Sequence, residues 1–144
     1  MWEGRFKSCL VDLERYLLMI HRYIELNPLR AAMTTAAEDD QWSSARFSLG
    51  IAADPTLSPH PAYLALGADP ACRATSYRQW LNQGVTDDEL HAIRLHLQQE
   101  RALGHPRFQA MAARTLNRRA CVQPSGRRKK SVTAEQRSSN GYLT

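Results

Sequence analysis

The fold of this chain is decided by residues 12–28, which read DLERYLLMIHRYIELNP. Asp12 has a side chain that suits a helix N-cap, and Pro28 disfavours the helical conformation of the residue before it. Between them, apolar residues recur at the spacing of a buried helix face. These residues are Leu13, Leu17, Ile20 and Ile24. The stretch therefore predicts an amphipathic helix that packs through this stripe and closes or kinks at Pro28.

Residues 1–11 precede this helix and alternate weakly between charged side chains and apolar or small ones. A period of two is typical of a β-strand, whose charged face would here contain Glu3, Arg5 and Lys7. No convincing second strand follows, and a lone strand leaves its backbone hydrogen-bonding groups without partners. We therefore expect one short N-terminal strand whose neighbouring strands are missing from this chain.

Capping signals mark further helices along the rest of the chain. Helices are expected over residues 42–48, 61–66, 70–82, 87–103 and 106–118, with a loop over residues 34–41. The clearest signals are Asp69 before a proline and the capping box that starts at Thr86 and ends at Glu89. Trp42 and Trp80 are expected to anchor the core. From residue 122 onward Pro, Gly, Ser and basic residues dominate, which predicts disorder.

The net charge of +5 is distributed unevenly. Residues 1–100 contain 9 Lys or Arg against 13 Asp or Glu, a net charge of −4, whereas residues 101–144 contain 10 against 1, a net charge of +9. A basic tail behind a mildly acidic body suggests a polyanionic partner, of which nucleic acid is the commonest. The alternative is a tail that only keeps the protein in solution. In the first case it would bind phosphates without reading base sequence.

Composition excludes several classes of protein. No stretch approaches the ~20 apolar residues that span a bilayer, and the N-terminus has no apolar signal core, so we expect a cytoplasmic protein without a membrane partner. Cys9, Cys72 and Cys121 are widely separated, which excludes a disulfide framework and any paired metal spacing. Each cysteine is expected to be reduced and partly buried.

The segment that points to chemistry is residues 23–31, YIELNPLRA. Residues four apart on a helix lie one turn above the other, so Tyr23 and Asn27 can reach the same point in space. A tyrosine can attack a phosphodiester and hold it covalently, and an amide oxygen can help to hold the metal ion that polarises the same phosphate. Arg30 can pair with a phosphate through its planar guanidinium. On spacing alone, a tyrosine at the core edge and an asparagine that ends a helix remain the alternative.

Five spaced blocks extend this pattern along the chain. They are residues 2–7 (WEGRFK), 23–31 (YIELNPLRA), 42–44 (WSS), 60–64 (HPAYL), and 102–104 (ALG) with the later pair 118–119 (RR). In this order and spacing, the blocks resemble the REP-associated tyrosine transposases. These enzymes are single-tyrosine relatives of the insertion-sequence transposases that cut single-stranded DNA. The resemblance covers most of residues 2–120.

This resemblance implies a nuclease of the His-hydrophobic-His class. In that family a histidine pair on a sheet strand and an amide side chain on the tyrosine helix bind Mg²⁺ or Mn²⁺. Matched residue by residue, Tyr23 would be the nucleophile that forms a 5′-phosphotyrosyl link, and Asn27 would be the third metal ligand. The implied partner is single-stranded or hairpin DNA, and a protein partner would be an intact transposase chain or a second copy of this one.

The chain departs from the family pattern at the metal site. The family's histidine pair precedes the block at residues 2–7, where this chain starts, and no His-hydrophobic-His triplet occurs elsewhere in it. Spacing argues against metal ligation by any of the five histidines, His21, His60, His91, His96 and His105. Two of three protein ligands are therefore missing, and we expect little or no catalytic activity from the chain as it stands. Smaller departures at Leu29, Ala32 and Ala45 concern the packing near the site.

Together these observations predict the back half of an α+β catalytic domain, here truncated to a mostly α-helical portion with one short N-terminal strand. The expected parts are residues 1–68, which carry the tyrosine helix, residues 69–121, a helical extension, and residues 122–144, a basic disordered tail. The reaction class is metal-assisted transesterification of single-stranded DNA through Tyr23. The residues expected to contact DNA are Arg5, Lys7, Arg30, Arg127, Arg128, Lys129 and Lys130. Two alternatives stay open, namely a DNA-binding remnant that does not cut and a helical interaction module whose basic tail is incidental.

Overall fold

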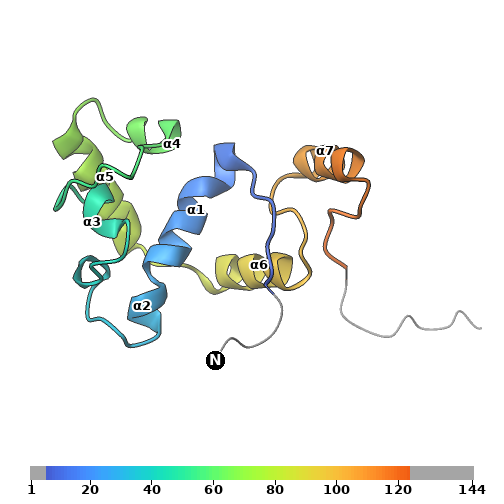
Figure 1. The fold of residues 1–144 in the computed structure, drawn as a ribbon, viewed down its shortest axis with the longest axis horizontal. Helices are drawn as coiled ribbons and strands as arrows, with labels where there is room; N and C mark the ends of the chain where they lie inside the picture. Colours follow the sequence, from blue (N-terminus) through green and yellow to red (C-terminus); the bar gives the residue numbers. More distant parts are fainter. Residues whose placement is uncertain (1–5, 124–144) are drawn as a thin grey trace, which may run out of the picture.

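The computed structural model of the protein describes residues 6–123 and is mostly helical in that part (Figure 1). In chain order the elements are α1 (Leu13–Glu25), α2 (Asn27–Arg30), the 3₁₀ helix η1 (Ala37–Asp39), α3 (Ala45–Ser48), α4 (Pro61–Leu64), α5 (Pro70–Asn82), α6 (Asp87–Gln98) and α7 (Pro106–Leu116). Helix α1 contacts both α4 and α6, while α5 contacts α3 and α4. The predicted, mostly helical class is confirmed for these residues. No helix among them is both long and apolar enough to cross a membrane.

The strand expected over residues 1–11 does not form in its described part. Val11 makes only an isolated parallel bridge with Leu103. The backbone N–H of Asp12 donates to the carbonyl of Leu103 at 2.9 Å. The prediction is wrong for residues 6–11, because the segment that pairs with them is too short to extend the bridge into a sheet. Residues 1–5 lie outside the described part.

Local capping chemistry sets where α5 and α6 begin, as the sequence predicts. The Asp69 side chain accepts the N–H of Cys72 at 2.9 Å. The Thr86 hydroxyl accepts the N–H of Glu89 at 3.2 Å, and the Glu89 carboxylate accepts the N–H of Thr86 at 2.9 Å. The predicted end of α6 at residue 103 is wrong. The helix stops at Gln98 because Glu100 adopts a left-handed backbone conformation with φ of 53°.

The tyrosine helix ends just before Pro28, and a second, short helix follows directly. Leu26 separates α1 from α2, and the N–H of Arg30 donates to the carbonyl of Leu26 at 3.0 Å. Pro28 has no N–H to continue the hydrogen-bond ladder of α1. Of the two predicted outcomes, closure or a kink, the structure has closure of α1 at Glu25, and α2 begins at Asn27.

The buried face of α1 differs from the predicted stripe. Leu13 and Ile24 are 52% and 55% exposed, whereas Arg22 and Glu25 are buried and Leu18 packs against the core. The prediction that Leu13 and Ile24 face the core is therefore wrong. Leu18, Arg22 and Glu25 still follow a helical period, but they lie on a different face. The reason is that both charged side chains find partners on α5, α6 and the segment before α3.

The main core lies between α1, α3, α4 and α5. Its buried members are Leu26, Ala37, Ala45, Leu49, Tyr77 and Leu81. Trp80 packs against it as predicted, but Trp42 is 88% exposed, so its predicted role as a core anchor is wrong. Cys9 is partly buried as expected, whereas Cys72 and Cys121 are exposed. Because α5 supplies part of this core, it packs with α1 even though the predicted boundary at residue 69 separates them.

A second, smaller cluster packs α7 against the chain segments that precede and follow it. Its buried members are Ala102, Ala112 and Ala120, and Phe108 packs against them. The N–H of Ala102 donates to the carbonyl of Ala120 at 2.9 Å, which joins the segment before α7 to the segment after it. A Cβ at Gly104 would lie 2.5 Å from Phe108 Cδ1 and 2.7 Å from Asp12 Cβ, so the close approach of these segments requires glycine.

Candidate functional site

Tyr23, Asn27 and Arg30 lie together where α1 meets α2. The Arg30 Cζ atom is 4.6 Å from the centroid of the Tyr23 ring, a distance at which a guanidinium is attracted to the ring face. Arg30 Nη2 donates to the backbone carbonyl of Tyr23 at 3.3 Å and also to Oδ1 of Asn27. Positions i, i+4 and i+7 share one face of a helix, and α2 continues α1 closely enough to preserve that face. The three residues that the sequence singled out are therefore neighbours, and we call them the tyrosine cluster.

Arg30 retains hydrogen-bond donors for a ligand. Its two described bonds both use Nη2, and Nη1 and Nε have no partner within residues 6–123. None of the ion pairs in this part of the chain includes Arg30. Arg30 and Asn27 are exposed, and Tyr23 is half-buried. A cation whose orientation is already fixed can bind an anion with little further loss of side-chain entropy.

The tyrosine cluster does not fit a divalent cation. Mg²⁺ demands a nearly octahedral set of oxygens at about 2.0–2.1 Å, and it is bound through carboxylates and waters. Here the amide oxygen of Asn27 already accepts a hydrogen bond from the Arg30 guanidinium, so a metal ion would lie beside a fixed positive charge. Residues 6–123 contain no group of three or more His, Cys, Asp or Glu that could hold a metal. The described side chains therefore do not supply further ligands.

Among the described residues, Lys7 is also predicted to contact DNA, and it is not part of this cluster. Lys7 is exposed, and no hydrogen bond or ion pair among the described residues joins it to Tyr23, Asn27 or Arg30. The other residues predicted to contact DNA are Arg5, Arg127, Arg128, Lys129 and Lys130, which lie outside the described residues.

A buried carboxylate lies on the opposite side of α1 from the tyrosine cluster. Glu25 is 1% exposed, and its two oxygens accept hydrogen bonds at 2.7 Å from the hydroxyls of Ser44 and Tyr77. Burial, together with the neighbouring Glu25 charge, raises the pKa of the Tyr77 phenol, so this hydroxyl remains a donor. The hydrogen bond between Glu25 and Tyr77 fixes the rotation of α1 against α5, so that the tyrosine cluster faces outward.

Arg22 fixes α1 against α6 in a similar way. Its Nη2 donates to both carboxylate oxygens of Glu89 at 2.8 and 2.9 Å, and its Nη1 donates to the Trp80 carbonyl at 3.3 Å. The Arg22 Cζ atom also lies 4.3 Å from the centroid of a Trp80 ring. Sequence reasoning missed these buried charges because isolated charges on a helix usually face solvent. The one signal in the sequence is that Leu18, Arg22 and Glu25 are spaced to lie on the same face of the helix.

Three of the five histidines, His60, His96 and His105, contact the backbone at or within helices. The Nδ1 atoms of His60 and His105 accept the N–H groups of Ala62 and Phe108 at 3.1 and 2.9 Å, which caps α4 and α7. His96 Nδ1 lies 2.8 Å from the carbonyl of Ala92, one turn earlier in α6.

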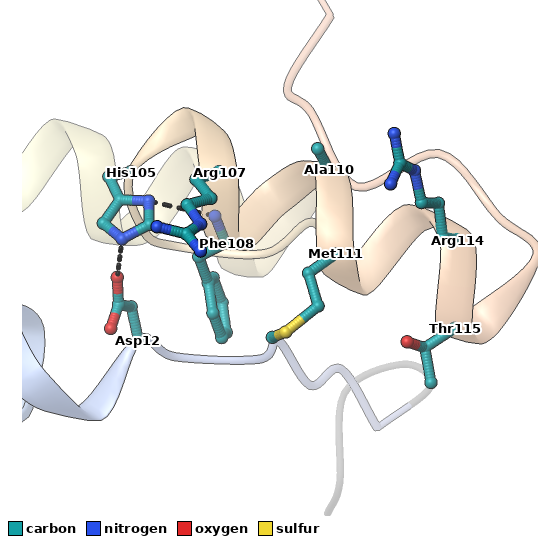
Figure 2. A pocket seen from close by; sticks show the side chains of 8 residues that line it. All are labelled: Asp12, His105, Arg107, Phe108, Ala110, Met111, Arg114 and Thr115. Carbon is teal, nitrogen blue, oxygen red and sulfur yellow. Dashed lines mark hydrogen bonds and ion pairs between the residues drawn. The ribbon is translucent and has the colours of Figure 1, made fainter.

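An open depression of about 770 Å³ lies beside α7 and the start of α1 (Figure 2). At one end, His105 Nε2 is 3.5 Å from Asp12 Oδ2. Because His105 Nδ1 accepts a hydrogen bond, the neutral ring carries its proton on Nε2, toward Asp12. The one hydroxyl among the lining residues, that of Thr115, is at the far end of α7 (Figure 2). The pair has no nucleophile beside it among these residues, and it holds α7 against α1.

No family profile, curated protein or solved structure matches this chain. A function must therefore be inferred from the residues themselves and from the order in which they occur.

Proposed function

We propose that this chain is a transposase-like protein that binds single-stranded or hairpin DNA, with Tyr23 as the group that would attack a phosphodiester. The observation that supports this proposal is the tyrosine cluster, in which a tyrosine, an amide and a cation without an ion-pair partner among the described residues share one accessible face. The basic residues of the C-terminal tail would add sequence-independent attraction to the DNA backbone. The proposed location is the cytoplasm.

In the proposed reaction class, Tyr23 Oη forms a bond to phosphorus and its proton passes to water. The bond between phosphorus and the 3′ oxygen of the preceding nucleotide breaks, and that oxygen leaves as a hydroxyl after it takes up a proton. The described residues offer Arg30 to stabilise charge on the phosphate, but they do not offer a divalent site. We therefore propose that the chain by itself binds DNA without cutting it efficiently, and that cutting would need an intact transposase chain as partner.

A second candidate function is supported by a different observation. Leu13 and Ile24 are each more than half exposed on α1, and exposed apolar side chains on one helix face are typical of protein interfaces. In this alternative, the chain is a helical interaction module and its basic tail is incidental.

Binding of a hairpin-bearing single-stranded oligonucleotide by the full chain separates the two candidates. For a DNA-binding protein we expect affinity to fall steeply as salt rises from about 50 to 200 mM, because phosphate contacts release counterions. Absent or salt-insensitive binding would overturn the proposal in favour of the interaction module. Incubation with Mn²⁺ followed by a denaturing gel tests cutting. A covalent adduct that disappears in Tyr23→Phe would contradict the inefficient cutting proposed for the isolated chain.

A further inference from the structure

We infer that Arg30 takes the place of a metal ion at the tyrosine, so that a DNA phosphate binds directly to its guanidinium without a divalent cation. This inference rests on the proposed function, since it specifies how DNA is held at the tyrosine cluster. It assigns Arg30 as the phosphate-binding residue, with Tyr23 and Asn27 as the residues that orient it.

The first support is the position of the guanidinium. The resemblance implies the Asn27 amide oxygen as a metal ligand, and here that oxygen accepts a hydrogen bond from Arg30 Nη2. The same Nη2 atom also donates to the Tyr23 carbonyl oxygen. A delocalised positive charge is already bound where the resemblance implies a metal ligand, and it needs no further protein ligands.

The second support is charge balance. Three other arginines of the described part, Arg22, Arg78 and Arg118, form ion pairs with glutamates, whereas others, such as Arg94, have none among the described residues. Arg30 has no such partner within residues 6–123, although two of its own bonds fix it in place. Glu25, the acidic residue of the same sequence segment, is buried and bonded to Ser44 and Tyr77. The charge of Arg30 is therefore available to an anion from solvent.

The third support is preorganisation. The Tyr23 ring supports one face of the guanidinium, and the two Nη2 hydrogen bonds fix its rotation, which leaves the Nη1 and Nε donors for a phosphate oxygen. Hydrogen bonds between charged groups are shorter and stronger than neutral ones. A phosphate bound at Arg30 would lie beside the Tyr23 side chain, where the proposed attack requires it.

The inference is tested by the affinity of the full chain for fluorescein-labelled single-stranded DNA, measured by anisotropy in EDTA and in Mn²⁺. Arg30→Gln removes the charge, and Arg94→Gln is the matched control. Arg94 lies on α6, is exposed and has no hydrogen bond or ion pair with any described residue. We expect the same wild-type affinity with and without metal, and about tenfold weaker binding for Arg30→Gln than for Arg94→Gln. Arg30→Lys should lie between them, because it keeps the charge but loses the planar contacts.

Two further variants test the orienting role of the ring. Tyr23→Ala removes the aromatic face under the guanidinium and should weaken DNA binding several-fold, whereas Tyr23→Phe keeps that face and should weaken binding less. Equal affinities for Arg30→Gln and Arg94→Gln would overturn the inference, and so would wild-type binding that is lost in EDTA. If the wild type binds no DNA in either buffer, the proposed function itself fails, which is a distinguishable result. Circular dichroism of each variant establishes that it is folded.

Discussion

The two faces of α1 use polar side chains in opposite ways. On the inner face, Arg22 and Glu25 are buried and each bonds to two other segments of the chain. On the outer face, which α2 continues, Arg30 bonds among the described residues to Tyr23 and Asn27 alone, and it keeps donors for solvent or a ligand. A side chain whose hydrogen bonds are all made inside the protein can position a helix, but it has little left with which to bind a partner. The inner face therefore orients the helix, and the outer face is the one available for recognition.

The largest expected effect is on the inner face. Glu25→Ala leaves the buried hydroxyl of Tyr77 and the partly buried hydroxyl of Ser44 without their acceptor and opens a cavity, so we expect the free energy of unfolding to fall by about 3–5 kcal/mol. The matched control is Glu38→Ala, which breaks an exposed ion pair with Arg78 and should cost under about 1 kcal/mol. Urea denaturation measures both. A similar cost for the two variants would mean that Glu25 does not orient α1.

Arg22→Met should have the next largest effect. Methionine can still cover Trp80, but the two bonds to Glu89 and the bond to the Trp80 carbonyl are lost. Because the Glu89 side chain is 28% exposed, water partly replaces its partner, and we expect a loss of about 2 kcal/mol. Single-stranded DNA affinity below the unfolding temperature should not change. A loss of affinity as large as that of Arg30→Gln would show that the two faces are coupled.

Acid should weaken the N-cap of α5, the helix that places Tyr77 beside Glu25. The hydrogen bond from the Cys72 N–H holds the pKa of Asp69 below its usual range. A lowered folded-state pKa means that this contribution is fully present above the unfolded pKa, about 4, and is lost as pH falls through the folded value. Asp69→Asn keeps the cap without the charge, so its melting temperature should fall less than that of the wild type between about pH 6 and 3. Equal falls would mean that Asp69 does not contribute.

The smallest stability effects are expected on the outer face. Tyr23→Phe and Asn27→Ala alter exposed or half-exposed groups that no other element contacts by hydrogen bond among the described residues. Each should change the free energy of unfolding by under about 0.5 kcal/mol. Thermal unfolding followed by circular dichroism is sufficient to measure this, and a loss above about 2 kcal/mol would place the cluster in the structural framework instead.

Local chemistry made parts of the fold predictable. The starts of α5 and α6 follow from Asp69 and Thr86, because a capping side chain bonds to backbone only two or three residues away. The end of α1 just before Pro28 is consistent with the missing N–H of that residue, which is also a local property of the sequence. Such contacts depend on neighbours in the sequence and need no knowledge of the tertiary fold.

Features that depend on distant partners were not predictable. Leu13 and Ile24 have the spacing of a buried stripe, yet the tertiary partners of Arg22 and Glu25 select another face of α1. Trp42 is exposed although tryptophan is usually well buried. At the site, the spacing of Tyr23 and Asn27 predicted their proximity, but the bond from Arg30 to the amide oxygen depends on side-chain orientation and could not be read from spacing.

The separation of the two faces is tested most directly by the single-stranded DNA affinity of Tyr77→Phe and Arg30→Gln, measured below the unfolding temperature of both. Tyr77→Phe removes one donor from Glu25 and should lower the free energy of unfolding by about 2 kcal/mol while binding DNA like the wild type. Arg30→Gln should keep the wild-type stability and bind about tenfold more weakly. Equal losses of affinity in the two variants, or a loss in Tyr77→Phe alone, would contradict the assignment of recognition to the outer face of α1.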